Sequence, residues 1–210
     1  MNYDNNKSEE IKGENLIIFH PLREGDLELV RTWRNQDEIR NNMYTNHIIS
    51  PEEHLAWYQK ISKGPGVRYW IFSADGMEKI GLVHLYDIDL KNRRAFWGIY
   101  LGNLSSQGKG IGSRVEFAVL DYVFFALNLN KLNCEVLAFN KSAINFYKKF
   151  GFKEEGDFKQ HIFRDGRFYD VVRLTMLKQE WTSQHRQRMK EVIGITEEQI
   201  ARKRVYVWER

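Results

Sequence analysis

A glycine-rich segment carries the clearest chemical signal in this sequence. Residues 107–112 read Gln-Gly-Lys-Gly-Ile-Gly and lie between a predicted strand and a long stretch of helical periodicity. Glycine adopts positive φ and lets an anion approach the backbone amides, and a helix N-terminus adds about half a positive charge. The segment therefore predicts a cradle for a pyrophosphate. Taken alone, it could equally be a loop that only turns the chain tightly into the helix.

The spacing of these glycines excludes two common phosphate-binding loops. The dinucleotide-binding fingerprint requires Gly-x-Gly-x-x-Gly, and the P-loop requires Gly-Lys followed by Ser or Thr. Here the glycines alternate with single residues, and Lys109 is followed by Gly110. The segment therefore matches neither of these two loops.

A second motif occupies residues 140–152, which read Asn-Lys-Ser-Ala-Ile-Asn-Phe-Tyr-Lys-Lys-Phe-Gly-Phe and follow a predicted strand. Ala143, Phe146, Tyr147 and Phe150 are spaced along one face of a short helix, which the next glycine can end. A tyrosine on such an apolar stripe is most often a core residue. The position of Tyr147 alone therefore assigns it no chemistry.

Hydrophobic periodicity predicts the elements that position both motifs. The Ser-Pro-Glu-Glu sequence at residues 50–53 predicts a helix start, and Asp165-Gly166 predicts the turn of a closing hairpin. The strands are expected at 16–20, 67–74, 79–89, 96–101 and 132–138 and on both sides of that turn, and the helices from 27, 51, 111 and 143. The helix from residue 111 is apolar on most of its circumference, so we expect it to be largely buried against an antiparallel sheet.

Length and composition indicate one domain. We expect a polar N-terminal tail at 1–15, one domain at 16–181 and an appended charged helical segment at 182–210. The lone Cys134 and the lack of any metal-ligand spacing predict a reducing compartment and no metal. The sequence shows no signal peptide or membrane-spanning stretch, which predicts a cytoplasmic location.

The two motifs together resemble the GCN5-related N-acetyltransferase (GNAT) superfamily. Gln-x-x-Gly-x-Gly precedes a helix, and Asn-x-x-Ala-x-x-Phe-Tyr and Gly-Phe follow about thirty residues later. The resemblance covers residues 16–181 and implies an α/β (α+β) fold, in which helices flank a mixed, mostly antiparallel sheet. It also implies acetyl-CoA as co-substrate.

In that family the glycine-loop amides hold the CoA pyrophosphate, an Asn contacts the pantetheine arm and a Tyr hydroxyl lies near the thioester sulfur. The resemblance gives these roles to residues 107–112, Asn140 and Tyr147. A nearby hydroxyl eases the departure of a thiolate by donating a hydrogen bond or proton to it. The residues expected to bind acetyl-CoA are Leu101, Gln107, Gly108, Lys109, Gly110, Ile111, Gly112, Ser113, Asn140, Ala143 and Tyr147.

The reaction implied is direct attack of a neutral amine on the acetyl carbonyl, without a covalent enzyme intermediate. Backbone N–H near Leu101 is expected to stabilise the negative charge that develops on the carbonyl oxygen. Glu135, His84 and His54 are candidates to accept the ammonium proton. Each could instead have only a packing or surface role.

A narrower resemblance is to acetyltransferases that act on a nucleotide-linked 4-amino-4,6-dideoxy sugar on the route to pseudaminic acid. It rests on Arg34-Asn35, Met43-Tyr44, His54-Leu55 with Trp57, Gly98-Ile99-Tyr100, Leu132 to Val136, Phe163 to Gly166 and Tyr169 to Val171. It implies that Met43, Tyr44, His54, Trp57, His84 and Tyr100 shape the acceptor pocket. Residues 182–210 have no place in that pattern and could cap the site, mediate a homodimer or do neither.

Other acceptors and one other class of function stay open. The opening Leu22-Arg23 and Trp33-Arg34-Asn35 also resemble ribosomal-protein N-terminal acetyltransferases, and an aminoglycoside is a third acceptor. A non-catalytic acyl-CoA- or RNA-binding module would use the basic residues of 186–204, although such charge runs usually mark solvated helices. The net charge of +4 slightly favours an anionic sugar nucleotide, and we expect neither a nucleic-acid nor a membrane partner.

Overall fold

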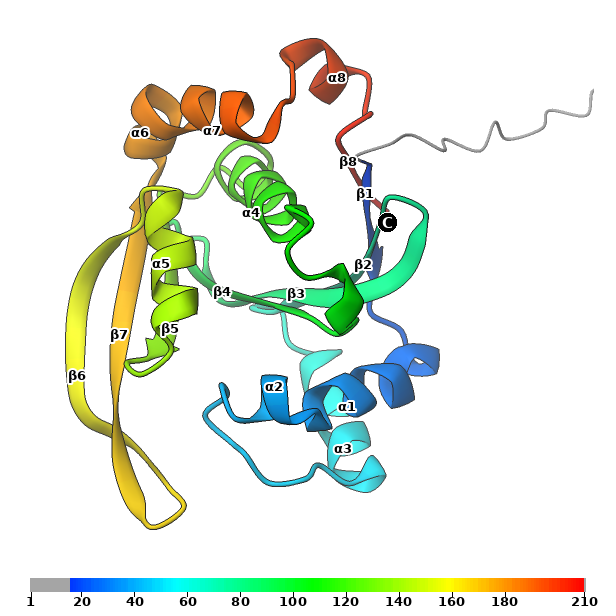
Figure 1. Ribbon diagram of the computed structural model, residues 1–210, viewed down its shortest axis with the longest axis vertical. Helices are drawn as coiled ribbons and strands as arrows, with labels where there is room; N and C mark the ends of the chain where they lie inside the picture. Colours follow the sequence, from blue (N-terminus) through cyan, green and yellow to red (C-terminus); the bar gives the residue numbers. More distant parts are fainter. Residues whose placement is uncertain (1–15, 210) are drawn as a thin grey trace, which may run out of the picture.

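The computed structural model describes residues 16–209, which form an eight-stranded sheet with helices on both faces (Figure 1). The expected polar tail at 1–15 lies outside the described residues. The strands are β1 (Ile17–Pro21), β2 (Arg68–Ala74), β3 (Met77–Asp89), β4 (Arg94–Leu101), β5 (Lys131–Leu137), β6 (Lys153–Arg164), β7 (Arg167–Leu177) and β8 (Tyr206–Trp208). The helices are α1 (Leu27–Asn35), α2 (Asp37–Arg40), α3 (Pro51–Ile61), α4 (Ile111–Asp121), α5 (Lys141–Lys149), α6 (Lys178–Glu180), α7 (Arg186–Ile193) and α8 (Glu197–Ala201).

The strand order is β6-β7-β5-β4-β3-β2-β1-β8. The pairs β4–β5 and β1–β8 are parallel, and the other neighbours are antiparallel. Helices α4 and α5 cover one face and α1 to α3 the other, while β6 and β7 form a long hairpin that bends away from the rest (Figure 1). The predicted mixed, mostly antiparallel sheet is confirmed.

Local sequence signals explain where the helices begin and end. Ser50 Oγ accepts a hydrogen bond from the Glu53 N–H at 3.2 Å, and Pro51 is the first residue of α3, as predicted. Asn140 Oδ1 caps α5 by accepting from the Ala143 N–H at 3.1 Å. Gly151 follows α5 with φ of +97°, a conformation that few other residues adopt.

The helix α4 is buried on all sides. Val115, Phe117, Ala118 and Leu120 point in different directions around it and are each 0% exposed. The sheet covers one side, and the C-terminal helices α6 and α7 lie along the opposite side (Figure 1). The expectation that this helix is largely buried is confirmed, and the burial needs the C-terminal segment as well as the sheet.

One buried carboxylate ties that C-terminal segment to α4. Asp121 accepts hydrogen bonds from Trp181 Nε1, from the Arg186 guanidinium and from the Tyr206 hydroxyl. Beyond α8, strand β8 then pairs with the edge strand β1. The charge-rich sequence of this segment predicts only helix, so strand β8 is not expected from it. Residues 206–208 form a strand because β1, at the other end of the chain, offers an edge with which they can pair. Over residues 16–209 no helix is long and apolar enough to cross a membrane.

Candidate active site

The central feature of the site is a fork between β4 and β5. These parallel strands pair at three positions only, Arg94 with Lys131, Ala95 with Leu132 and Phe96 with Asn133. Beyond that point β4 continues along β3 and β5 continues along β7. At the fork, Asn133 is buried and its Nδ2 donates to the Ala95 carbonyl at 3.0 Å. The strands therefore separate and open a wedge in the middle of the sheet.

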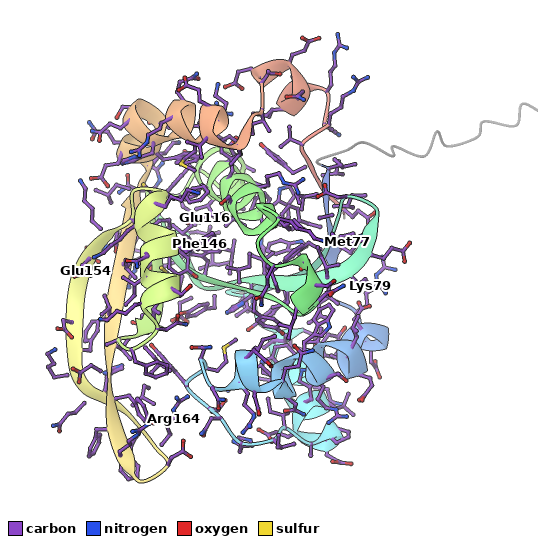
Figure 2. The ribbon with its side chains drawn as sticks, viewed as in Figure 1. Met77, Lys79, Glu116, Phe146, Glu154 and Arg164 are labelled. Carbon is purple, nitrogen blue, oxygen red and sulfur yellow. The ribbon has the colours of Figure 1, made fainter. Side chains whose placement is uncertain are left out.

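The glycine loop lies between the end of β4 and the start of α4. Gly108 and Gly110 have φ of +75° and +74°, and a Cβ added to either would meet no atom within 4 Å. Gly110 is the N-cap of α4, so the amides of the first turn are free of intrahelical partners. A Cβ on Gly112 would touch the Phe146 ring of α5 at 3.5 Å, and Figure 2 shows Phe146 on the side of α5 that faces α4. The open space beside these amides fits a pyrophosphate.

A cavity of about 680 Å³ occupies the wedge. Its lining comes from β2 to β5 of the sheet, from α1 to α3, from the segment after α2 and from α5 with its N-cap. The predicted site residues that line it are Met43, Tyr44, Trp57, His84, Tyr100, Leu101, Gln107, Glu135, Asn140, Ala143 and Tyr147. Residues 108–113 lie at the start of α4 outside this lining, and the Ile111 side chain is buried in the core.

Tyr147 lies at the inner wall of the cavity. Its ring is 6% exposed and packs edge-on against Trp97, with ring centres 5.5 Å apart. Burial raises the pKa of the Tyr147 hydroxyl well above its usual value. The residue is therefore both a core residue and a cavity residue, and its hydroxyl stays protonated and can donate over the whole neutral range.

The backbone of β4 supplies an N–H toward the wedge. Gly102 N–H donates to the Ile80 carbonyl of β3 at 2.8 Å. Because successive amides of a strand point to opposite edges, the Leu101 N–H points away from β3, toward the fork. Leu101 also lines the cavity. This orientation agrees with the predicted role of a backbone donor near Leu101.

Glu135 lies across the cavity on β5, with both carboxylate oxygens engaged. Oε1 accepts from Arg173 Nε and Nη2 at 3.1 and 2.6 Å, and Oε2 accepts from the Tyr44 hydroxyl at 2.8 Å. The side chain is 14% exposed. The carboxylate is thus fixed in position, and its negative charge is already paired with a guanidinium.

The structure separates the two predicted histidines. His84 lines the cavity, where its ring stacks between Tyr69 and Tyr86 at centroid distances of 5.0 and 5.4 Å. Burial lowers the pKa of His84 to about 4, so the ring is neutral at pH 7. His54 is buried, stacks on Trp57 and does not line the cavity. The resemblance places His54 beside the acceptor, whereas in the structure His54 is buried behind the lining, against Trp57.

Further cavity residues were not predicted from the sequence. Arg34 lines the cavity, and its Nη2 donates to the Thr45 carbonyl and Oγ1, both at 2.9 Å. Burial lowers the pKa of Arg34. Glu38, Tyr69, Tyr86 and Trp97 also line the cavity. Arg34 belongs to the Arg34-Asn35 pair on which the narrower resemblance partly rests, but that pair alone does not place its side chain in the cavity.

A strand fork, a glycine loop at a helix N-terminus and a buried tyrosine beside the fork define an enzyme that transfers an acyl group from acyl-CoA. Comparison with known proteins gives the family. Residues 17–153 match the family described as an acetyltransferase (GNAT) domain, so the chain belongs to the GNAT acetyltransferases. The protein is an acetyl-CoA-dependent N-acetyltransferase, and the predicted fold and co-substrate are confirmed.

The relatives of this chain include spermidine acetyltransferases and a protein whose name gives no acceptor. The spermidine N(1)-acetyltransferase of Escherichia coli K12 is 30% identical over 81% of this chain and 90% of its own length. A crystal structure of the Vibrio cholerae spermidine N-acetyltransferase with CoA and spermine superposes with a TM-score of 0.73 at 29% identity, covering 80% of this chain and 98% of that one. The acetyltransferase PseH of Campylobacter jejuni is 29% identical over 62% of this chain and 79% of its own length. The comparisons establish amine acetylation, and the narrower resemblance is not confirmed by them.

Within residues 16–209 no group of three or more His, Cys, Asp or Glu side chains is arranged to hold a metal ion.

Proposed function

We propose that this enzyme acetylates the 4-amino group of a UDP-linked 4-amino-4,6-dideoxy sugar, an acceptor of the pseudaminic acid pathway. The observation that carries the proposal is the charge of the cavity. Its charged lining residues are Arg34, Glu38 and Glu135, and Glu135 is paired with Arg173. Apart from that pair, the lining carries one guanidinium, that of Arg34, and one carboxylate, that of Glu38. A neutral or anionic acceptor suits this balance.

A polyamine is the second candidate, because the spermidine acetyltransferases match this chain at about 30% identity. A polyamine carries several ammonium groups, each of which requires a carboxylate or several oxygen acceptors when it leaves water. This cavity offers Glu38 for that purpose, and Arg34 adds a positive charge to the same lining. The charge distribution favours the amino sugar over the polycation.

The aromatic lining is the second support for a sugar. Tyr44, Trp57, Tyr86 and Tyr100 come from four separate elements and enclose the cavity. Apolar ring faces pack well against the C–H faces of a pyranose and against the methyl group of a 6-deoxy sugar. A flexible polyamine chain has no ring face and therefore makes less extensive contact with these aromatic rings.

The residues then take the following roles. Bound acetyl-CoA supplies an activated thioester carbonyl, with its pyrophosphate at the amides of residues 108–113. Leu101 N–H donates to the carbonyl oxygen, and the Tyr147 hydroxyl donates to the departing sulfur. Glu135 orients the amine and receives its proton. Accepting the proton would make His84 a buried cation, and at Glu135 it would break the charge pairing with Arg173.

The test is CoA release with a panel of acceptors: a UDP-linked 4-amino-4,6-dideoxy sugar, spermidine, an aminoglycoside and N-terminal peptides. We expect kcat/KM for the sugar nucleotide to exceed that for every other acceptor by at least a hundredfold. Preference for spermidine would replace the proposal with polyamine acetylation, and preference for peptides would replace it with N-terminal acetylation. An Arg34→Gln variant adds a direct check, since it should favour spermidine relative to the sugar nucleotide.

A further inference from the structure

A second pocket lies on the outer side of the acceptor cavity, against the tip of the β6–β7 hairpin. It has a volume of about 740 Å³ and is lined by the hairpin, by the segment after α2 and by the β5–α5 loop. Figure 2 shows Arg164 near the hairpin tip, on the side that faces the segment after α2. Arg164 donates to the Asn41 carbonyl at 2.8 Å and to the Met43 carbonyl. The hairpin tip is thus fixed to the segment that forms the acceptor cavity.

The two pockets share the same two loops. Residues 42–45 line the acceptor cavity, while the flanking Asn41 and Asn46 line the second pocket. In the β5–α5 loop, Leu137 and Asn140 line the cavity, while the residues between them, Ala138 and Phe139, line the second pocket. The two pockets therefore lie on opposite sides of the same two loops.

The chemistry of the second pocket combines guanidinium groups with flat rings. The guanidinium carbons of Arg164 and Arg167 lie 4.6 and 4.7 Å from the centre of the Tyr169 ring. Phe139 and Phe168 are 48% and 58% exposed at the pocket wall. Exposed apolar rings beside cations are suited to a planar, negatively charged ligand.

The carboxylates at this pocket, Asp165 and Asp170, have hydrogen-bond partners other than its two arginines. Asp170 accepts hydrogen bonds from Lys159 Nζ at 3.1 Å and from the Gln160 N–H at 2.8 Å, and Asp165 accepts from Asn46 Nδ2. Among the described residues, neither Arg164 nor Arg167 has a carboxylate oxygen within 4 Å. Two cations without an acidic partner thus stand at the exit of a cavity that is nearly neutral.

We infer that this second pocket binds the nucleoside diphosphate part of the acceptor, with Arg167 at the diphosphate and Phe168 against the base. Arg164 supports the site by holding the segment after α2. The inference rests on the proposed function, because it places the part of the sugar nucleotide that does not react. It makes the hairpin tip a specificity element for the nucleotide, separate from the residues that carry out acetyl transfer.

The experiment uses UDP itself as the probe. UDP binding is measured by calorimetry with the full chain and with Arg167→Gln and Phe168→Ala variants. Arg202→Gln is the matched control, because Arg202 is an exposed arginine on the far C-terminal helix and its replacement removes the same charge. We expect Arg167→Gln to weaken UDP binding about tenfold, the effect of one charge-assisted contact. Acetyl-CoA affinity should stay unchanged in all three variants.

Kinetics then separate this inference from the acceptor assignment. We expect Arg167→Gln to raise KM for the UDP-linked sugar but not for the methyl glycoside of the same amino sugar. Suppose that the enzyme turns over the UDP-linked sugar but that wild type and Arg167→Gln bind UDP with equal affinity. The proposed subsite would then be wrong, while the proposed acceptor would stand. If the enzyme did not turn over the sugar nucleotide, the proposed acceptor would be wrong. If wild type did not bind UDP, the proposed subsite would be wrong. If Phe168→Ala abolished a dimer without changing UDP affinity, the exposed rings would belong to self-association and the assignment of the base would be wrong.

Discussion

The Tyr44 hydroxyl donates a hydrogen bond to Glu135 Oε2 at 2.8 Å, although the two residues are 91 positions apart in the chain. The bond joins the segment after α2 to β5 across the mouth of the acceptor cavity. Burial and the neighbouring carboxylate raise the pKa of Tyr44, so the hydroxyl remains a donor at any working pH. Arg173 holds the other oxygen of the same carboxylate. Glu135 is therefore oriented from two sides.

Replacing Tyr44 by Phe removes this bond and keeps the ring. We expect kcat/KM for the acceptor to fall about tenfold, since a hydrogen bond to a charged group contributes about 1.5 kcal/mol or more. The KM for acetyl-CoA should not change. Tyr58→Phe on α3 is the control, because Tyr58 does not line the cavity. Equal loss for both co-substrates would show that Tyr44 acts on the fold and not on Glu135.

Tyr147 is assigned to the departing sulfur, and Tyr147→Phe tests that role. The ring packs against Trp97, so the variant should keep its melting temperature and its acetyl-CoA affinity. We expect kcat to fall by about a hundredfold, because the hydroxyl acts mainly as charge develops on sulfur. Pre-steady-state measurement of CoA release separates this step from product release. A variant with wild-type kcat would remove Tyr147 from the mechanism.

Local features of this fold could be predicted from the sequence, because their causes lie within a few residues. The helix start at Ser50, the hairpin turn at Asp165-Gly166 and the left-handed glycines of residues 108–110 depend on backbone chemistry that single residues specify. The same holds for α4, whose apolar circumference predicts its burial.

Features that depend on distant segments could not be predicted in this way. The fork at Asn133 forms because β4 and β5 separate there and pair only with β3 and β7 beyond it. Strand β8 forms because β1, at the opposite end of the chain, is its partner. The position of His54 relative to the cavity depends on packing in a similar way. A motif transfers residue types, but packing decides that Trp57 lines the cavity while His54, one turn earlier on the same face of α3, is buried beside Trp57 outside the lining.

Gly110 offers a test of the pyrophosphate cradle with a matched control. Gly110 and Gly76 both have left-handed φ, +74° and +77°, and open space at the Cβ position, but Gly76 lies in the β2–β3 turn. Alanine at either position should destabilise the fold by about 1 kcal/mol through backbone strain. Only Gly110→Ala should also weaken acetyl-CoA binding, by about tenfold in calorimetry, because its methyl group intrudes on the space beside the amides. Equal affinities in the two variants would rule out the cradle.

His84 gives the fold a dependence on pH that can be worked out. Burial lowers the pKa of His84 to about 4 in the folded protein, from an ordinary value of 6.5. Below pH 6.5 the unfolded chain takes up a proton that the folded chain refuses until about pH 4, so folding stability falls as the pH is lowered through this window.

Between pH 7 and pH 5 these two pKa values correspond to a loss of about 2 kcal/mol in the free energy of unfolding. Urea unfolding of wild type and of His84→Gln at both pH values measures it. We expect the variant to be less stable at pH 7, because it loses the stacking on Tyr69 and Tyr86, but to lose less stability on acidification. His161→Gln is the control, since His161 is exposed on β6 and should leave the pH dependence as it is. Parallel pH dependences for wild type and His84→Gln would mean that His84 is hydrated enough to take up a proton in the folded state.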